Sequence, residues 1–227
     1  MRHQLAIAAL ALVALTACDD DDPTNPPAQG RVRVVHAISD VTATDILMNG
    51  ATVKTDLAYK SADVYRARNV GDHEIEVREA DAATDLITLD HEIEANKDYS
   101  IFAYGSEATS KSLALTDNNA APAANKAKVR VVHVADGEAA FDVYVVEDEA
   151  DVATATPVAT DISSGEASAY VTVDAETYFV VLTEVGEKDE VLSVPNVDLT
   201  TGKIRTIVVA EKAGGGGPIE AVKLNDN

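Results

Sequence analysis

Two histidines, each followed nine residues later by an aspartate, are the first side chains that could carry chemistry. His36 precedes Asp45, and His133 precedes Asp142 at the same spacing. A His–Asp pair can transfer protons, and imidazole with carboxylate can hold a weakly bound metal. The same spacing also fits a histidine at a strand end that is hydrogen-bonded across a turn. A closed zinc site normally takes four ligands, and each pair supplies only two.

A five-residue string, Asp-His-Glu-Ile-Glu, occurs twice, at residues 72–76 and 90–94. If the two strings pair as neighbouring strands, their imidazoles and carboxylates come together. Four side chains are then candidate ligands for a weakly bound divalent cation: His73, His91, Glu74 and Glu92. Alternation of polar and apolar residues on a half-exposed strand produces the same pattern without any ligand.

The sequence contains no motif that assigns catalytic residues. Gly-x-Ser-x-Gly, His-Glu-x-x-His, a dinucleotide-binding fingerprint and a calcium loop of the required spacing are all missing. The glycine run 214–217 lacks the Lys-Ser/Thr of a phosphate loop and is typical of a hairpin loop. The sequence therefore predicts a protein that is not an enzyme and that has no cofactor.

An internal repeat shows which elements position these residues. The string Val-Arg-Val-Val-His at 32–36 recurs at 129–133, a spacing of 97 residues. Farther along, Thr-Asp-Leu at 55–57 matches Thr-Asp-Ile at 160–162, a spacing of 105. The additional residues fall in the acidic stretch Glu147 to Thr156, which is expected to be either a contact loop or variable surface.

Each copy reads as a series of short strands rich in Val, Ile and Thr, whose branched side chains suit a pleated surface. In the first copy, strands are expected near 31–37, 44–48, 51–56, 62–68, 73–79, 86–93, 99–104 and 112–116. Such spacing predicts an all-β fold of two tandem antiparallel β-sandwich domains, immunoglobulin-like in architecture. The expected domains are 31–118 and 128–227, joined by a linker at 119–127.

The amino terminus has the organisation of a bacterial lipoprotein signal peptide at residues 1–17. Its apolar run, residues 5–15, is too short to cross a membrane as a helix. Leu-Thr-Ala-Cys then ends at Cys18, the single cysteine of the chain, where a lipobox places the lipidated residue. Acyl chains there would anchor the protein to a membrane. Residues 18–30 are expected to be a lipid-bearing, flexible acidic tether.

The net charge of −21 excludes nucleic acid as a favoured partner, because such a surface repels phosphate backbones. The expected location is the cell envelope, with the lipid at the periplasmic or outer face of a bacterial membrane.

The opening of each copy resembles the domain of unknown function 4397, a family of exported bacterial and archaeal proteins that often occurs in tandem. Its pattern, Val-Arg-Val-Val-His-Ala, a turn and then Asp-Val-Tyr-Val, is similar to residues 32–37 and to residues 142–145. The later aromatic positions are taken by Tyr65 and Tyr170. The Ser-Pro-Asp-Ala-Pro turn of the family is replaced in both copies. The resemblance implies a fold and no activity.

Together these observations predict a non-catalytic envelope lipoprotein that displays two β-sandwich modules to a protein or glycan partner. Two alternatives stay open. One is a structural or stress-related protein whose acidity serves solubility in salt, and the other is a weak divalent-cation binder.

Overall fold

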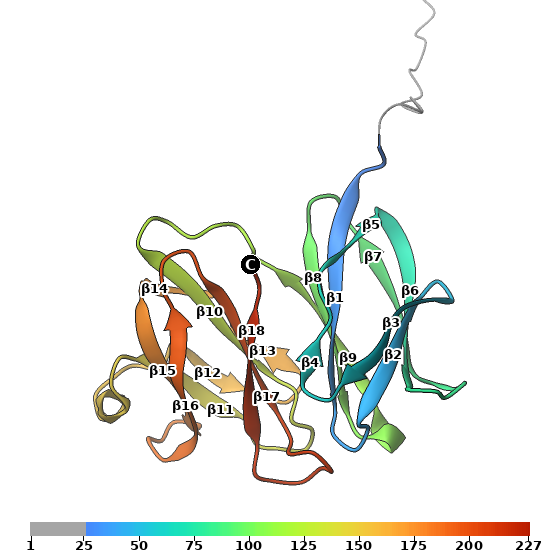
Figure 1. Ribbon diagram of the computed structural model, residues 1–227. Helices are drawn as coiled ribbons and strands as arrows, with labels where there is room; N and C mark the ends of the chain where they lie inside the picture. Colours follow the sequence, from blue (N-terminus) through green and yellow to red (C-terminus); the bar gives the residue numbers. More distant parts are fainter. Residues whose placement is uncertain (1–25) are drawn as a thin grey trace, which may run out of the picture.

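The computed structural model describes residues 26–227, which are built almost entirely of β-strands (Figure 1). The predicted signal peptide, the predicted lipid site at Cys18 and most of the predicted tether lie outside this range. Within residues 26–227, no helix is long and apolar enough to cross a membrane.

Nine strands make up each of two domains. Domain 1 contains β1 (Gln29–Ile38), β2 (Ala43–Met48), β3 (Ala51–Ala58), β4 (Ser61–Ala62), β5 (Arg66–Asn69), β6 (Gly71–Glu79), β7 (Asp85–Ile93), β8 (Asp98–Gly105) and β9 (Lys111–Asp117), with the short 3-10 helix η1 (Glu107–Thr109). Domain 2 contains β10 (Lys126–His133), β11 (Phe141–Val146), β12 (Ala159–Ile162), β13 (Glu166–Ala167), β14 (Val171–Asp174), β15 (Glu176–Glu184), β16 (Glu190–Leu199), β17 (Ile204–Ala210) and β18 (Glu220–Asn225), with the 3-10 helix η2 (Glu149–Ala153).

Each domain is a β-sandwich of two sheets, as the sequence predicts. In domain 1, the inner sheet has the order β4-β1-β8-β9 with β5 also on β1, and the outer sheet has the order β3-β2-β6-β7. In domain 2, the inner sheet is β13-β10-β17-β18 with β14 on β10, and the outer sheet is β12-β11-β15-β16. Pairing is antiparallel except between β1 and β8 and between β10 and β17, which are parallel. The two domains therefore repeat one topology, including its parallel pair.

The observed strands follow the expected ones closely, with one difference in the first copy. The strand expected at 62–68 is interrupted, because β4 and β5 flank residues 63–65. Tyr65 leaves the ladder there and turns its hydroxyl group to Asp117. At the other end of the domain, β9 ends at Asp117 and β10 begins at Lys126, so two residues expected in the linker start a strand.

Turn chemistry explains the tightest hairpin. Asn49 and Gly50 connect β2 to β3 with φ values of +49° and +74°. Both residues therefore lie in the left-handed region, which Asn and Gly enter more easily than other residues and which a two-residue hairpin of this kind requires.

The apolar core of each domain lies between its two sheets, and a third apolar cluster joins the domains. Val32 and Val34 of β1 point into the core of domain 1. Val35 and Ala37, on the opposite face of the same strand, pack with Val132 of domain 2. Because both faces of β1 are covered, the strand reads as an almost continuous buried run.

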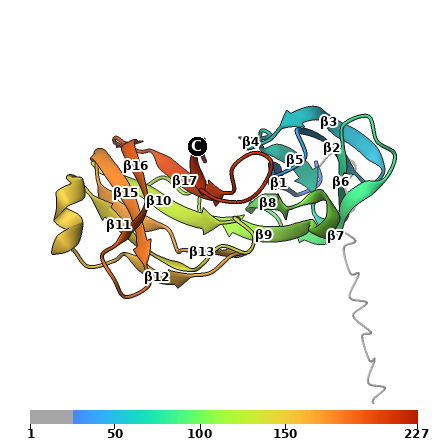
Figure 2. The same ribbon diagram turned by 90° about the horizontal axis from the view of Figure 1, so that it is seen from below.

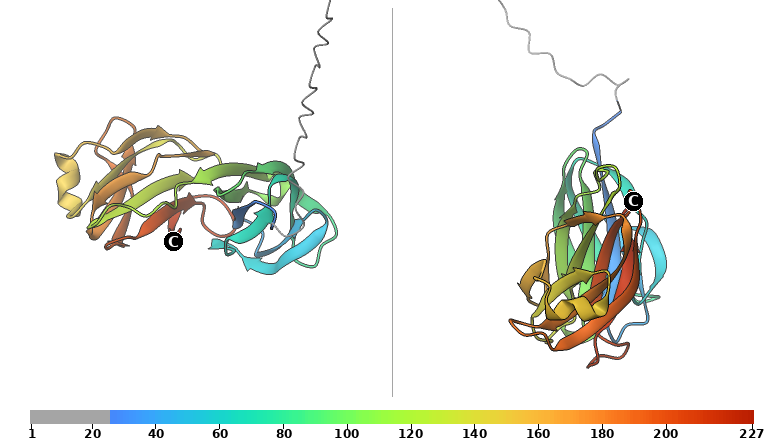
Figure 3. Two further views of the ribbon diagram at one scale, coloured as in Figure 1. Left: turned by 90° about the horizontal axis from the view of Figure 1, so that it is seen from above. Right: turned by 90° about the vertical axis from the view of Figure 1, so that its left-hand side faces the viewer.

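The inner sheets of the two domains consequently face each other, and we call this contact the junction. Figures 2 and 3 show the molecule elongated along the line that joins the domains, with η2 at the far end of domain 2. Seen along that line, domain 2 covers domain 1 (Figure 3, right).

Candidate functional site

The two histidines singled out from the sequence occupy equivalent positions in the structure. His36 is fully buried, with its Nε2 2.9 Å from the carbonyl oxygen of Val41, while its Nδ1 accepts from the backbone N–H of Ile38 at 3.3 Å. His133 repeats the arrangement with Ala139 (3.1 Å) and Ala135 (3.3 Å). These partners favour a neutral ring that is protonated at Nε2. Burial lowers the pKa of His36 to about 4, and it also lowers the pKa of His133.

The structure does not bring Asp45 or Asp142 to these histidines. The Asp45 carboxylate accepts the backbone N–H of Asp56 at 3.0 Å, and the Asp142 carboxylate accepts that of Asp161 at 2.9 Å. Asp56 and Asp161 have φ values of +52° and +55°, so each carboxylate stabilises a left-handed residue. The other oxygen of Asp142 accepts the N–H of Gly186 at 2.9 Å. Histidine and aspartate thus hold separate turns.

The repeated Asp-His-Glu-Ile-Glu strings do pair, as β6 with β7, and His73 lies directly opposite His91. Alternation along the strands sends Glu74 and Glu92 to the other face of the sheet. His73 is hydrogen-bonded to the Asn69 carbonyl oxygen at 2.9 Å. In residues 26–227, no group of three or more His, Cys, Asp or Glu side chains is placed to hold a metal ion.

His91 has a different environment from its cross-strand neighbour. Its ring contacts Tyr99 edge-on at 4.6 Å, and its Nε2 is buried without a hydrogen-bond partner among the described residues. Burial lowers the pKa of His91, against the opposing charge of Glu92.

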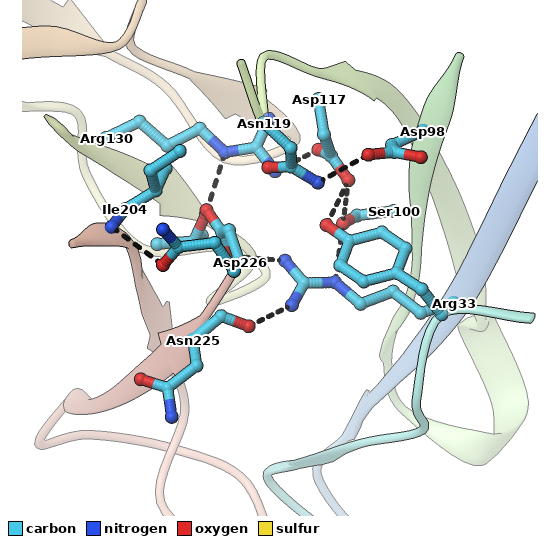
Figure 4. A network of polar contacts seen from close by, with 12 residues as sticks. Arg33, Asp98, Ser100, Asp117, Asn119, Arg130, Ile204, Asn225 and Asp226 are labelled. Carbon is cyan, nitrogen blue, oxygen red and sulfur yellow. Dashed lines mark hydrogen bonds and ion pairs between the residues drawn. The ribbon is translucent and has the colours of Figure 1, made fainter. Parts of the chain in front are cut away.

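The most elaborate polar site is the junction, where each domain supplies an arginine to an aspartate of the other (Figure 4). The Arg33 guanidinium of β1 donates to the Asp226 carboxylate at 2.6 Å. Arg130, the equivalent residue of β10, forms an ion pair with Asp117. Both arginine side chains are 3% exposed and both carboxylates 0% exposed. The two ion pairs are therefore reciprocal and fully enclosed.

Each aspartate is also held by its own domain. The Asp117 carboxylate accepts the hydroxyl groups of Tyr65 and Ser100, both at 2.6 Å. The Ser100 hydroxyl oxygen in turn accepts a hydrogen bond from Nε of Arg33 at 2.8 Å, which links the two ion pairs into one network. Domain 2 repeats these contacts. The Asp226 carboxylate accepts hydrogen bonds from the hydroxyl groups of Tyr170 (2.8 Å) and Thr206 (2.7 Å). The Thr206 hydroxyl oxygen in turn accepts a hydrogen bond from Nε of Arg130 at 2.9 Å.

The tyrosine rings complete the same arrangement on both sides. The Arg33 guanidinium lies 4.5 Å from the centre of the Tyr65 ring, and that of Arg130 lies 4.6 Å from the Tyr170 ring. Burial raises the pKa of both tyrosines, so their hydroxyl groups remain donors. Burial is the largest influence on Arg33 and acts to lower its pKa, but Asp226, Tyr65 and Asp117 together raise the pKa of the guanidinium. Such a dense set of hydrogen bonds offsets the cost of enclosing four charges.

Contacts beyond the network extend the junction. The β17–β18 loop reaches toward domain 1, where the Gly214 N–H donates to the Ser39 carbonyl oxygen at 2.7 Å (Figure 2). Tyr59 donates to the carbonyl oxygen of Glu211 at 2.7 Å. In the opposite direction, Lys111 of β9 forms an ion pair with Asp136 at 2.7 Å. These contacts join the two domains outside the apolar cluster and the Arg–Asp network.

The inserted stretch Glu147 to Thr156 folds back onto its own domain. Val152 of η2 is buried against Tyr144 and Val181, on the outer face of the outer sheet. The Lys188 ammonium donates to the Tyr144 hydroxyl at 3.0 Å and to the Ala155 carbonyl oxygen at 2.7 Å. The insertion therefore covers an apolar patch.

The junction residues were not among the candidates chosen from the sequence. Arg33 and Arg130 could have been found, because each is a charged residue between two valines at matching positions of the repeat. Asp117 and Asp226 likewise close the two copies at matching positions. Nothing in the sequence shows that each arginine meets the other copy's aspartate.

Comparison with known proteins agrees with the resemblance. The domain of unknown function (DUF4397) matches residues 30–144. The chain belongs to this family. The matched range covers the first sandwich and reaches Tyr144 in the outer sheet of the second.

No match was found among the curated proteins. Two solved structures match this chain at low sequence identity. CBMbc (family CBM26) from Eubacterium rectale Amy13K, in complex with maltoheptaose, is 13% identical; the match covers 86% of this chain and 97% of that one, with a TM-score of 0.29. The Bacillus anthracis TIE protein is 10% identical, with coverage of 81% and 34% and a TM-score of 0.27. Neither similarity assigns a function to this chain.

Proposed function

We propose that this chain is a non-catalytic cell-envelope lipoprotein, anchored through Cys18, that presents two β-sandwiches as one rigid unit to a protein partner. The observation that carries the proposal is the reciprocal Arg–Asp junction. It encloses four charged side chains between the domains, and such a rigid pair offers a fixed surface at low entropic cost on binding.

A protein partner is favoured over a glycan by the aromatic residues. Glycan sites commonly stack sugar rings on exposed aromatic side chains. The chain has 3 Phe, 7 Tyr and no Trp. All of these lie in residues 26–227, and none is exposed there. Several exposed valines are present instead.

The positions of the loops support an outward-facing role. β1 begins at Gln29 at one end of domain 1, and the β8–β9, β15–β16 and β17–β18 hairpins lie at the opposite end (Figure 1). A lipid at Cys18 would place those hairpins on the side away from the membrane.

The anchor is tested in cells by labelled palmitate incorporation and by protease shaving. Wild-type chain should incorporate label and sediment with membranes, and Cys18→Ala should do neither. Asp22→Ala is the matched control and should behave as wild type. A Cys18→Ala chain that remains in the membrane fraction would contradict the proposed anchor.

The protein-contact role is tested by photo-crosslinking in intact cells, with the crosslinker at the exposed Val185. A discrete adduct with an envelope protein is expected. The crosslinker at the exposed Val70, whose backbone N–H donates to the Ala28 carbonyl oxygen beside the start of β1, serves as control. Equal adducts from both positions would indicate random collision and contradict a defined contact.

A further inference from the structure

A groove opens at the hairpin end of domain 2, away from Gln29. It has a volume of about 570 Å³ and is lined by Glu138, Ala139, Ala140, Glu184, Val185, Val191 and Ile219. Its apolar lining is accessible, since Val185 is 46% exposed and Val191 is 44% exposed. Both lie in or beside the β15–β16 hairpin, while Ile219 precedes β18.

The hairpin that carries the two valines is braced. The Gly186 N–H donates to the buried Asp142 carboxylate at 2.9 Å, and the Glu184 N–H donates to the Asp189 carbonyl oxygen at 3.0 Å. Exposure of the valines is therefore a property of a fixed surface, which lowers the ordering cost of any partner that covers it.

Two carboxylates line the groove, Glu184 and Glu138, and the hairpin that carries Glu184 is acidic. The hairpin at 184–190 carries four carboxylates: Glu184, Glu187, Asp189 and Glu190. Its single lysine, Lys188, donates to Tyr144 and Ala155 and forms no ion pair with these carboxylates within residues 26–227. Glu138 adds a carboxylate from the connection between β10 and β11. An apolar groove beside these carboxylates is complementary to an apolar side chain flanked by cations.

The repeat provides an internal comparison. The corresponding end of domain 1 has a groove of about 630 Å³ lined by Asp40, Thr84, Asp85, Leu86 and residues 107–110. Its lining is mostly polar, and the Ser110 hydroxyl donates to the Leu86 carbonyl oxygen at 2.7 Å. The fold therefore does not require an apolar groove here, and the two domains differ at this position.

We propose that this groove binds a segment of the partner protein that carries an apolar side chain flanked by lysine or arginine. The proposal rests on the proposed role in protein contact and specifies its site. Val185 and Val191 would contact the apolar side chain, and the carboxylates of 184–190 and Glu138 would pair with the cations.

The test uses the purified full chain carrying Cys18→Ser and a short fluorescent peptide of alternating leucine and lysine. Peptides of leucine with glutamate and of serine with lysine are the controls. Binding is followed by fluorescence anisotropy at low and high salt. The leucine–lysine peptide should bind, with affinity that falls as salt screens the carboxylates.

Val185→Ser with Val191→Ser should weaken binding about tenfold, and Val158→Ser, an exposed valine of the same domain outside the groove, should leave it unchanged. Equal binding by wild type and the double variant, or by the serine–lysine peptide, would show mere attraction to an acidic surface and overturn the proposal. No binding of the leucine–lysine peptide would also overturn it. Anchoring of the chain in cells is measured separately, so failure of the groove and failure of the lipoprotein proposal are distinguishable.

Discussion

At the residue scale, the structure gives the Val-Arg-Val-Val-His string of each copy two separate purposes. Its histidine, as a neutral ring, is hydrogen-bonded to the turn after the strand. Its arginine forms an ion pair with an aspartate of the other domain. The spacing left open whether His36 belongs with Asp45 or holds a turn, and in the structure each side chain bonds to backbone groups of a different turn. Backbone partners are invisible to a search for paired functional side chains, which is why the sequence could not decide between the interpretations.

Removing one member of a buried ion pair should be costly. Arg33→Met or Asp226→Leu alone should lower the free energy of unfolding by about 3–5 kcal/mol, because the partner charge stays enclosed. The double variant should lower the free energy of unfolding by less than the sum of the two single losses, because no buried charge is left without its partner. Urea denaturation measures each value.

The matched control is Arg31→Met. Its pair with Asp98 is 2.5 Å long, but the arginine side chain is 51% exposed, so the expected loss is below about 1 kcal/mol. Equal losses at Arg31 and Arg33 would show that the junction carries no special stability.

Acidification should destabilise the protein through His36. The ring has a pKa of about 4 when folded and about 6.5 when unfolded, so the unfolded chain binds more protons between these values. Stability is therefore lost as pH falls through that window. From about pH 7.5 to about pH 5 the loss due to this ring should be about 2 kcal/mol.

The measurement is urea denaturation of wild type and His36→Gln across that range. The variant is less stable at neutral pH, and the gap between the two should narrow on acidification. A gap that stays constant would contradict a neutral, buried His36.

At the element scale, most strands could be predicted, because alternation and turn residues define them locally. The interruption between β4 and β5 could not, since it depends on Tyr65 reaching Asp117 across the sheet. The parallel pairing of β1 with β8 joins residues far apart in the sequence, and no local pattern distinguishes it from antiparallel pairing. The inserted stretch was recognisable as an insertion, but its packing against Tyr144 was not.

The insertion should contribute to stability through η2. Val152→Ser places a hydroxyl group against the apolar patch of Tyr144 and Val181 and should lower the unfolding free energy by about 1–3 kcal/mol. Ala153→Ser, an exposed neighbour, should change it by less than about 0.5 kcal/mol. Thermal and urea denaturation measure both variants. An unchanged Val152→Ser protein would mean that η2 does not depend on this contact.

At the scale of the whole molecule, charge and the junction act in opposite directions. A net charge of −21 makes the chain repel itself, whereas the junction holds its two halves together. The composition predicted the repulsion. The contact between the two inner sheets could not be predicted. The sequence of a strand that is apolar on both faces shows that both faces are buried, but not which element covers each face.

Monovalent salt should therefore stabilise the fold, because screening relieves the repulsion between surface carboxylates. The midpoint of thermal unfolding should rise steadily with sodium chloride. A midpoint that does not respond to salt would contradict the idea that the acidic surface opposes folding.

The rigid junction is tested most directly by the distance between the domains in solution. Nitroxide labels at Val70→Cys and Val158→Cys, both at exposed positions, report it in a chain that carries Cys18→Ser. Pulsed electron resonance should give one narrow distance distribution, which broadens when Arg33→Ala and Arg130→Ala are introduced together. A broad distribution in the labelled chain with both arginines intact would contradict the account that the two β-sandwiches form one unit.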